Sequence, residues 1–306
     1  MTGTETSIRV GSADGRLFLD VRGDAGAPAL LYLHGGPGLG CHEFMSWQGE
    51  RLSGRLRLIG LDQRGVLRSD PLRPGTTLSE GDLVDDCEAL REWLGLERWA
   101  LLGHSFGGRV ALRYAHRYPD RVSAVVFENP AWDVAETERL RLPAAAAIFE
   151  ELGDADAAAA CRAVAAGPRN DQWESIELVS RLDKHGRYHD LYVHQPAARE
   201  EFDRMVATNP YPKEWRERGN RHGALLMETA DVMVSVLPLL AGLRAPALRV
   251  KGMYDLVTGP GQRAGFRAAV PHGVVEVFER SGHFVQLEEP ERYAELVGGF
   301  VRRYAR

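Results

Sequence analysis

The chain has 306 residues, 26% of them charged, with 38 basic and 43 acidic side chains and a formal net charge of −5. This length can bury a core in one large domain with an insertion, and the acidic balance argues against nucleic acid as a partner. No apolar run reaches the ~20 residues of a membrane span, and residues 1–10 lack a signal peptide. We therefore expect a cytoplasmic protein that is not bound to membranes.

The first elements are predicted to be a β-hairpin and a buried strand. Short apolar segments at 8–10 and 17–21 flank an Asp-Gly turn dipeptide. The apolar run 29–33 then leads directly into the sequence HGGPG at 34–38. Glycines let the backbone approach a bound carbonyl group, so the N–H of Gly36 is a candidate donor of an oxyanion hole. An ordinary Gly/Pro turn is the alternative interpretation.

A further strand is predicted at 56–61, and it ends in the sequence DQRG at 62–65. We expect the charged residues of this motif to form a buried ion pair that braces neighbouring loops, with a polar turn as the alternative. Ser79 begins a capping-box pattern, which predicts a helix through residue 94. The apolar residues of this helix share one face.

The most informative motif is GHSFG at 103–107, which lies between an apolar run at 99–102 and a helix-like stretch at 109–118. A chain that passes directly from a buried strand into a helix turns so sharply that side chains two residues either side of Ser105 would collide, and glycine avoids the collision. The turn exposes Ser105 at its tip, and the N–H of Phe106 points to where an oxyanion would form. The pattern predicts a nucleophilic serine with Phe106 as an oxyanion-hole donor.

The segment 131–236 interrupts the alternation of strands and helices that follows. A strand is predicted at 122–127, after which two alanine-rich stretches favour helix and no strand is predicted within the segment. We expect this insertion after the sixth strand to form a helical cap over Ser105, which selects substrates by shape and excludes water. Residues 1–130 and 237–306 would form the core around a mostly parallel sheet covered on both faces.

Two further strands are predicted at 247–250 and 274–278, and each leads into a polar residue on a loop, Asp255 and His283. The carboxyl ends of parallel strands lie side by side and form the ligand crevice. Ser105 would be the nucleophile, His283 the general base and then acid, and Asp255 the group that orients the imidazole. Taken alone, the aspartate could be a turn residue and the histidine a solvated loop residue.

Alternatives remain for the acid and for a metal site. Glu128 ends the sixth predicted strand and is the alternative triad acid. The cluster His185, His189, Asp190 and His194 invites a metal interpretation, but a metal site needs a converging carboxylate. Serine chemistry needs no metal, and three widely spaced cysteines offer neither a disulfide framework nor zinc-ligand spacing. We predict no metal and no cofactor.

Taken together, HGGPG at 34–38, DQRG at 62–65 and GHSFGG at 103–108 resemble the proline iminopeptidase-like branch of the α/β-hydrolases. The resemblance covers residues 8–130 and 246–304. It implies an α/β-hydrolase fold, with a mostly parallel eight-stranded sheet flanked by helices and an inserted helical cap. It also implies the same Ser-His-Asp triad and no metal. Many members cleave an N-terminal residue, often proline, from small peptides.

Two departures from this family's pattern leave the substrate open. The elbow reads GHSFG where proline iminopeptidases usually have GGSWG. In addition, DQRG is usually followed by x-Gly-x-Ser, and Leu67 replaces that glycine here. The first expectation is an aminopeptidase or amide hydrolase acting on a small molecule or short peptide. The first alternative is an ester, lactone or C–C bond hydrolase, because the elbow sequence resembles the elbows of such enzymes. The second alternative is a non-hydrolytic ligand receptor. In the resembling family, cap glutamates hold the substrate ammonium. Candidates here are Glu200, Glu201 and Glu228 by residue type and Glu128 by its place at the entry to the cap, with a solvated surface charge as the alternative role of each.

Overall fold

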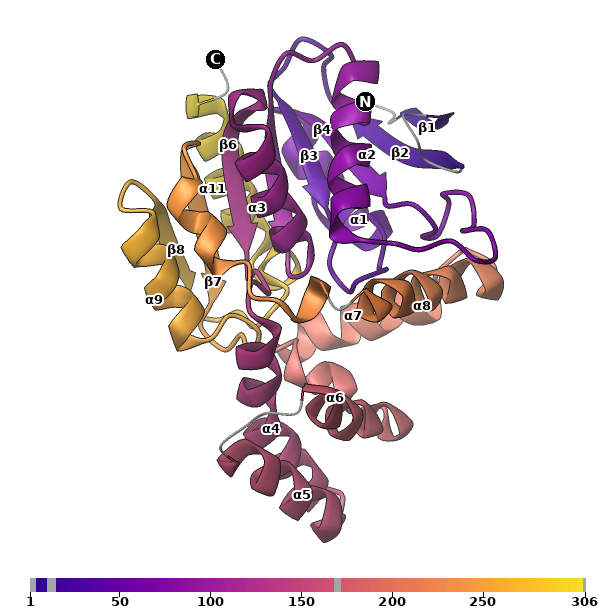
Figure 1. The fold of residues 1–306 in the computed structure, drawn as a ribbon, viewed down its shortest axis with the longest axis vertical. Helices are drawn as coiled ribbons and strands as arrows, with labels where there is room; N and C mark the ends of the chain where they lie inside the picture. Colours follow the sequence, from indigo (N-terminus) through magenta and orange to yellow (C-terminus); the bar gives the residue numbers. More distant parts are fainter. Residues whose placement is uncertain (1–3, 10–14, 168–171, 230, 305–306) are drawn as a thin grey trace.

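An eight-stranded sheet forms the centre of the molecule in the computed structural model, which describes residues 4–9, 15–167, 172–229 and 231–304 (Figure 1). The strands follow the order β1-β2-β4-β3-β5-β6-β7-β8. β2 pairs antiparallel with β1 and β4, and the other pairs are parallel. The strands are β1 (Thr4–Arg9), β2 (Arg16–Arg22), β3 (Ala29–Leu33), β4 (Arg57–Asp62), β5 (Trp99–His104), β6 (Val122–Glu128), β7 (Ala247–Gly252) and β8 (Val274–Phe278). The mostly parallel sheet predicted from the sequence is confirmed.

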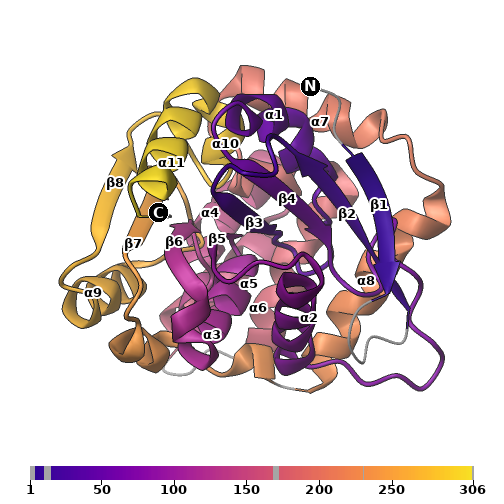
Figure 2. The same cartoon turned by 90° about the horizontal axis from the view of Figure 1, so that it is seen from above.

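Helices cover both faces of the sheet (Figure 2). On one face lie α1 (His42–Ser53) and α11 (Pro290–Tyr304), whose apolar side chains share a buried cluster with those of the central strands. The other face is covered by α2 (Glu80–Trp93), α3 (Gly107–Arg117) and α9 (Pro260–Ala269). Because both faces are buried, β3 and β5 consist of continuous runs of buried residues rather than alternating ones.

Most of the predicted elements occur close to their predicted positions. The two hairpin strands pair from Thr4 with Val21 to Arg9 with Arg16, while the predicted turn at 10–14 lies outside the described residues. Ser79 and Asp82 form a full capping box at the start of α2. The paired strands and the start of α2 are therefore present as expected, although the first strand already begins at Thr4.

The chain between β6 and β7 contains helices joined by turns and no strand within its described residues, 129–167, 172–229 and 231–246. Its α-helices are α4 (Val134–Glu151), α5 (Ala155–Ala166), α6 (Gln172–Ser180), α7 (Pro196–Ala207) and α8 (Lys213–Glu228). The shorter helices of the molecule are η1 (Pro119–Arg121), η2 (Arg181–His185), η3 (Tyr188–Leu191), η4 (Asp231–Met233), η5 (Leu237–Gly242) and α10 (Val285–Glu288). The helical insertion after the sixth strand is present, as predicted.

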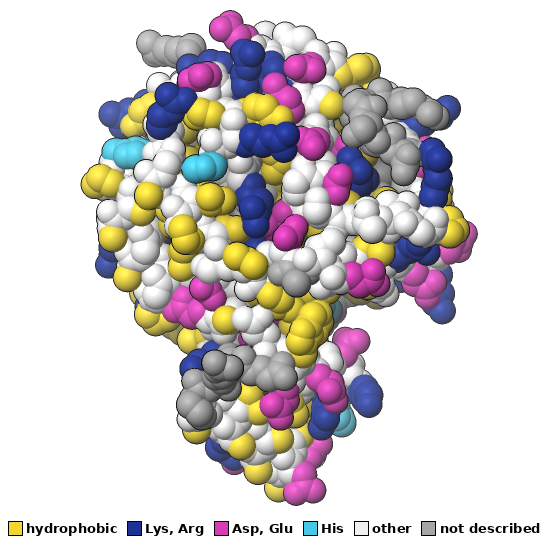
Figure 3. All heavy atoms as spheres, viewed as in Figure 1, with side chains coloured by type: hydrophobic (Ala, Val, Ile, Leu, Met, Phe, Trp, Pro, Cys, Tyr) yellow, Lys and Arg dark blue, Asp and Glu magenta, His cyan; other side chains and the backbone are white. Residues whose placement is uncertain are grey.

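The inserted helices fall into two groups in space. α4, α5 and α6 extend away from the sheet as a lobe, whereas α7 and α8 run beneath the end of the sheet formed by β1 to β4 (Figure 1). The lobe has its own hydrophobic cluster, which includes Leu142, Phe149, Cys161 and Leu178. A narrower waist joins it to the body of the molecule, and basic and acidic side chains are interspersed on the face shown in Figure 3. No helix in the described ranges is both long and apolar enough to cross a membrane.

Candidate active site

Ser105 sits on the sharp turn between β5 and α3. Its φ is 54°, in the left-handed region, and its side chain is largely buried. A Cβ atom on Gly103 would overlap the backbone of Gly107, and one on Gly107 would overlap the carbonyl of Leu33. The glycines two residues either side of the serine are therefore required by close packing, as the sequence predicted.

Asp255 and His283 come together at the carboxyl edge of the sheet, each on the loop that follows its strand. Their contact joins His283 Nδ1 to Asp255 Oδ1 at 2.8 Å, and both side chains are buried. An ionised carboxylate can only accept a hydrogen bond, so the proton of this contact belongs to Nδ1 of the imidazole. The other ring nitrogen, Nε2, is then unprotonated in the neutral ring and can act as a base.

Four donors surround the carboxylate of Asp255. Besides the imidazole, they are the ammonium of Lys251 at 3.0 Å and the backbone N–H groups of Val257 and Thr258, each at 3.0 Å. Burial alone would raise the pKa of Asp255, but the charge of Lys251 and the bond from His283 outweigh burial and hold the pKa below its usual value. Asp255 therefore stays ionised and keeps the imidazole in one tautomer.

Glu128, the alternative acid, lies elsewhere in the core. Its carboxyl group accepts hydrogen bonds from the hydroxyl of Tyr293 at 2.7 Å and from the N–H of Gln286 at 3.1 Å. Burial raises the pKa of Glu128 to about 8. The structure thus brings Asp255, and not Glu128, to the imidazole.

The loop after β3 packs against the serine from the other side. A Cβ atom on Gly35 would lie 2.8 Å from the Cβ of Ser105, and Gly36 has a φ of 114° that favours glycine. Gly36 and Phe106 line the same cavity as Ser105 and His283. Neither the N–H of Gly36 nor that of Phe106 donates a hydrogen bond to another described residue. Both predicted oxyanion-hole donors therefore remain available.

A buried ion pair braces this loop, as the DQRG motif suggested, but with a different arginine. Asp62 pairs with Arg68, whose Nε lies 2.7 Å from Oδ2, and Oδ1 accepts from the N–H of Cys41 at 2.8 Å. Arg64 of the motif instead pairs with Asp86 of α2 at 2.6 Å. Leu67, which replaces a glycine of the resembling family, keeps a positive φ of 39°. The backbone of this turn therefore has the left-handed conformation that favours glycine, although the residue is leucine.

Asn129 connects the loops of the site, and the sequence analysis missed it. Its amide nitrogen donates to the carbonyl groups of Gly282 and His283 at 3.1 and 2.9 Å, and its oxygen accepts from the N–H of Gly252 at 3.0 Å. Its φ is 39°, a conformation that asparagine tolerates better than most residues. An asparagine directly after a strand at the carboxyl edge was the available signal.

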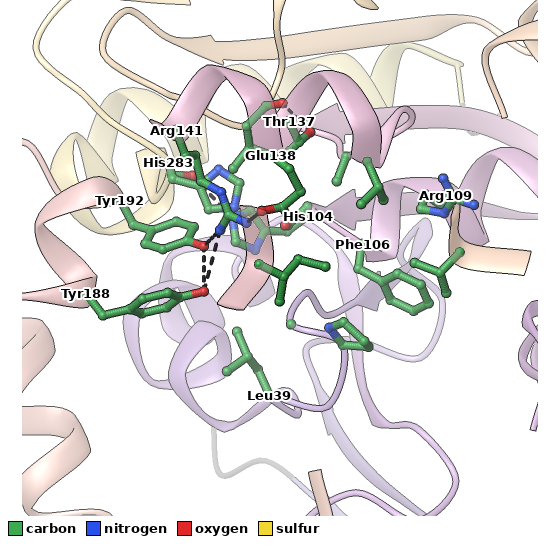
Figure 4. A pocket seen from close by; sticks show the side chains of 18 of the residues that line it. Leu39, His104, Phe106, Arg109, Thr137, Glu138, Arg141, Tyr188, Tyr192 and His283 are labelled. Atoms are coloured by element: carbon green, nitrogen blue, oxygen red, sulfur yellow. Dashed lines mark hydrogen bonds and ion pairs between the residues drawn. The ribbon is translucent and has the colours of Figure 1, made fainter. Parts of the chain in front are cut away.

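A cavity of about 350 Å³ lies above Ser105 and His283, and the inserted helices form part of its wall (Figure 4). Glu138 and Arg141 on α4 form an ion pair that is largely buried. Arg141 also donates to the hydroxyl of Tyr192, which lies 2.9 Å from that of Tyr188. These side chains meet on one side of the cavity, near His283. A small polar group can therefore be bound close to the triad.

The sequence analysis did not single out this cluster. A Glu and an Arg three residues apart on a helix are common on solvated surfaces, so their spacing carried no signal for a pocket. The glutamates that it named for the substrate ammonium lie elsewhere: Glu128 is buried in the core, Glu200 and Glu228 are exposed, and Glu201 pairs with Arg204. None of them lines the cavity.

Three of the four residues that invited a metal interpretation, His189, Asp190 and His194, contact other side chains. Asp190 pairs with Arg187 and Arg199, and His194 stacks on Tyr254. The described residues contain no group of three or more His, Cys, Asp or Glu side chains placed to hold a metal ion.

Known proteins resemble this chain in sequence over parts of it that range from 37% to 93% of its length. The profile of the family described as "alpha/beta hydrolase fold" matches residues 28–290. A proline iminopeptidase from Heyndrickxia coagulans is 26% identical over 93% of this chain and 97% of its own. A second, from Xylella fastidiosa, is 37% identical over 37% of this chain, a match that spans 36% of the relative's length.

A solved structure shows the same fold. A proline iminopeptidase-related protein from Thermus thermophilus superposes with a TM-score of 0.81 at 23% identity, over 100% of this chain and 99% of its own. The proline iminopeptidase of Mycobacterium smegmatis gives a TM-score of 0.66 at 21% identity, over 98% and 99% of the two chains. The chain therefore belongs to the α/β-hydrolase fold family and has proline iminopeptidases among its relatives.

Proposed function

We propose that this protein is a serine hydrolase that forms an acyl-enzyme on Ser105, and that it acts as an aminopeptidase-like amide hydrolase on small substrates. One observation carries the proposal: Asp255 holds the imidazole of His283 by a buried hydrogen bond, and His283 lines the same cavity as Ser105. The strained backbone of Ser105 supports it, because such strain is retained at functional positions.

The mechanism follows from these positions. His283 takes the proton of Ser105 through Nε2 while Oγ attacks the substrate carbonyl carbon. The N–H groups of Gly36 and Phe106 hold the oxyanion that forms, and losing one such donor typically costs about 3 kcal/mol of transition-state stabilisation. The imidazolium then gives its proton to the leaving group, and His283 activates a water molecule that releases the acyl group from the serine. Asp255 stabilises the charged imidazolium throughout.

The helices of 131–236 act as a cap in this proposal. They contribute Glu138, Arg141, Tyr188 and Tyr192 to the wall of the reaction cavity. A volume of about 350 Å³ suits a small substrate rather than a protein chain. Amide hydrolysis is the first choice because a relative named as a proline iminopeptidase aligns with 93% of the chain.

One observation favours the second candidate, an ester, lactone or C–C bond hydrolase. Glu138 is the acidic residue among those that line the reaction cavity, and Arg141 is its ion-pair partner. An aminopeptidase needs a carboxylate that binds the substrate's ammonium group. A glutamate that is already paired with an arginine binds an ammonium group poorly.

A substrate panel separates the two candidates. The panel compares the p-nitroanilides of proline and alanine with their N-acetylated forms and with p-nitrophenyl butyrate. We expect kcat/KM for the free-amine anilides to be at least about tenfold higher than for the blocked anilides. One charge-assisted hydrogen bond to the ammonium group provides a difference of this size. The aminopeptidase proposal fails if the blocked anilides or the ester alone are cleaved. The Ser105→Ala variant is the control and should cleave none of them.

A further inference from the structure

A second cavity of about 320 Å³ adjoins the reaction cavity. It lies between α1, the loop after β3, and helices α7 and α8. Leu39, His104, Phe202 and Phe284 line both cavities and form their common wall. Leu39 is 46% exposed, so its side chain can move aside at low cost. We call this second cavity the Glu43 chamber, after the acidic residue that lines it.

Aromatic rings form much of the wall of the Glu43 chamber. Tyr32 stacks on Phe44 with ring centroids 3.7 Å apart. The ring centroid of Phe202 lies 5.0 Å from that of Phe284 and 6.1 Å from that of Trp47. The faces of aromatic rings attract cations, and the attraction strengthens where water is excluded.

Glu43 brings a carboxylate into these aromatic surroundings without a partner. No hydrogen bond or ion pair joins its side chain to another described residue beyond its own backbone. The residue is partly exposed, yet burial raises its pKa to about 7. Both facts fit a carboxylate deep in the protein whose exposed part faces the chamber.

Other polar atoms at the chamber also lack partners. Gln286 is 1% exposed, and its Oε1 accepts no hydrogen bond from a described residue. Trp47 Nε1 is similarly buried and unpaired. A buried polar group without a partner costs about 1–3 kcal/mol, so a second unpaired acceptor on a residue that lines the same chamber is unexpected in a purely structural role.

The charges around Glu43 do not offset it. Arg68 is paired with Asp62. Arg216 of α8 also lines the chamber, but its side chain is exposed, so water screens its charge. Burial lowers the pKa of His104, of His189 and of the adjacent His42, so these imidazoles are neutral at pH 7 and above. Once Glu43 is ionised, above a pH of about 7, its carboxylate is therefore the buried charge of the chamber.

We propose that the Glu43 chamber is a second substrate subsite, which binds a protonated amine carried on an apolar arm of the substrate. Glu43 is the anionic partner, and the aromatic walls enclose the arm. This inference rests on the proposed function, because it assumes that the rest of the substrate occupies the cavity above Ser105. It concerns a different group from the α-amine of an N-terminal residue, which lies two bonds from the scissile carbonyl carbon and must stay in the reaction cavity.

Two esters of equal shape test the proposal by turnover. They are the p-nitrophenyl esters of 6-aminohexanoic acid, which ends in an ammonium group at pH 8, and of heptanoic acid, which ends in a methyl group. We expect kcat/KM of the wild type to favour the cationic ester by about tenfold, the size of a charge-assisted hydrogen bond. Glu43→Gln keeps the side-chain shape and should remove this preference. Glu50→Gln, an exposed position on the same helix, should retain it.

A direct binding measurement separates failure of the subsite from failure of the proposed function. Isothermal titration calorimetry with hexylammonium and with hexan-1-ol at pH 8 should show that the cation binds the wild type about tenfold more tightly than it binds Glu43→Gln, with no such difference for the alcohol. If both esters are hydrolysed without a preference that depends on Glu43, the subsite is rejected and the hydrolase proposal stands. If neither ester is hydrolysed, calorimetry decides alone: equal affinities of hexylammonium for the two proteins overturn the subsite.

Discussion

Two buried carboxyl groups near the site, those of Asp255 and Glu128, have opposite electrostatic surroundings. Lys251 and His283 hold the pKa of Asp255 low despite its burial, whereas burial raises the pKa of Glu128 to about 8. Asp255 is therefore charged at neutral pH and able to stabilise an imidazolium. Glu128 is largely neutral at pH 7, and it accepts hydrogen bonds from Tyr293 and Gln286 within the core.

Replacing each carboxyl by its amide should separate these two roles. Asp255→Asn presents a donor to His283 or leaves the imidazole in the wrong tautomer, so we expect kcat to fall by about 10³-fold or more. Glu128→Gln is close to the neutral carboxyl in shape and should stay within about threefold of the wild type. Steady-state kinetics on the best substrate of the panel measures both. A large loss in Glu128→Gln with Asp255→Asn still active would reverse the assignment.

Glu43 should reduce stability at alkaline pH. Its folded-state pKa of about 7 lies above the value of 4.5 expected for the unfolded chain, so the folded protein binds more protons between these values. The contribution of this group to the free energy of unfolding therefore falls as pH rises from about 4.5 through 7. The free energy of unfolding of Glu43→Gln should match that of the wild type near pH 5. At pH 8.5 it should be about 1–2 kcal/mol larger, after allowance for solvent in the chamber.

Urea denaturation at both pH values measures this difference, with Glu50→Gln as the matched control. A difference between Glu43→Gln and the wild type that stays constant from pH 5 to 8.5 would contradict an unpaired carboxylate at this position.

At the scale of elements, the sheet and the elbow were predictable because their signals are local. The apolar runs at 29–33 and 99–102 indicated buried strands, and the glycines around Ser105 indicated the turn. The pair of Glu138 and Arg141 was not predictable, and the place of Asn129 directly after a strand indicated only a polar residue at the carboxyl edge of the sheet. Their roles depend on contacts with loops and helices far away in the sequence, which no local pattern encodes. The same holds for Glu43, because the chamber exists only once α1, α7 and α8 have packed together.

The connection that Asn129 makes between loops should affect the rate more than substrate binding. Asn129→Gly keeps a residue that accepts the positive φ but removes the three hydrogen bonds that hold the loops of Gly252 and His283. We expect kcat to fall by about tenfold and KM to stay within about twofold, because His283 loses its placement while the cavity is kept. A rise in KM at unchanged kcat would show that Asn129 acts on binding instead.

At the scale of the whole molecule, the site is assembled from one core and one insertion. Ser105, Asp255 and His283 lie on core loops, whereas the helices of 131–236 close the cavity. The lobe of α4 to α6 has a hydrophobic cluster of its own and joins the body at a waist. The lobe should therefore be able to loosen while the sheet stays folded.

Phe149→Ala tests this organisation. Phe149 is fully buried in the cluster of the lobe, and truncation of such a side chain typically costs about 3–5 kcal/mol. We expect limited proteolysis to cut the variant much faster than the wild type, at sites within 131–236. Cuts spread evenly over the core and the insertion would indicate a single cooperative unit instead.

The central claim is that Ser105, His283 and Asp255 act together as one nucleophilic relay. Reaction with a fluorophosphonate, followed by intact-protein and peptide mass spectrometry, tests it most directly. The account predicts a single adduct on the peptide that contains Ser105, no adduct in Ser105→Ala, and labelling slowed by about 10³-fold in His283→Ala. A wild-type protein that stays unmodified, or a Ser105→Ala variant labelled as fast as the wild type, would contradict it.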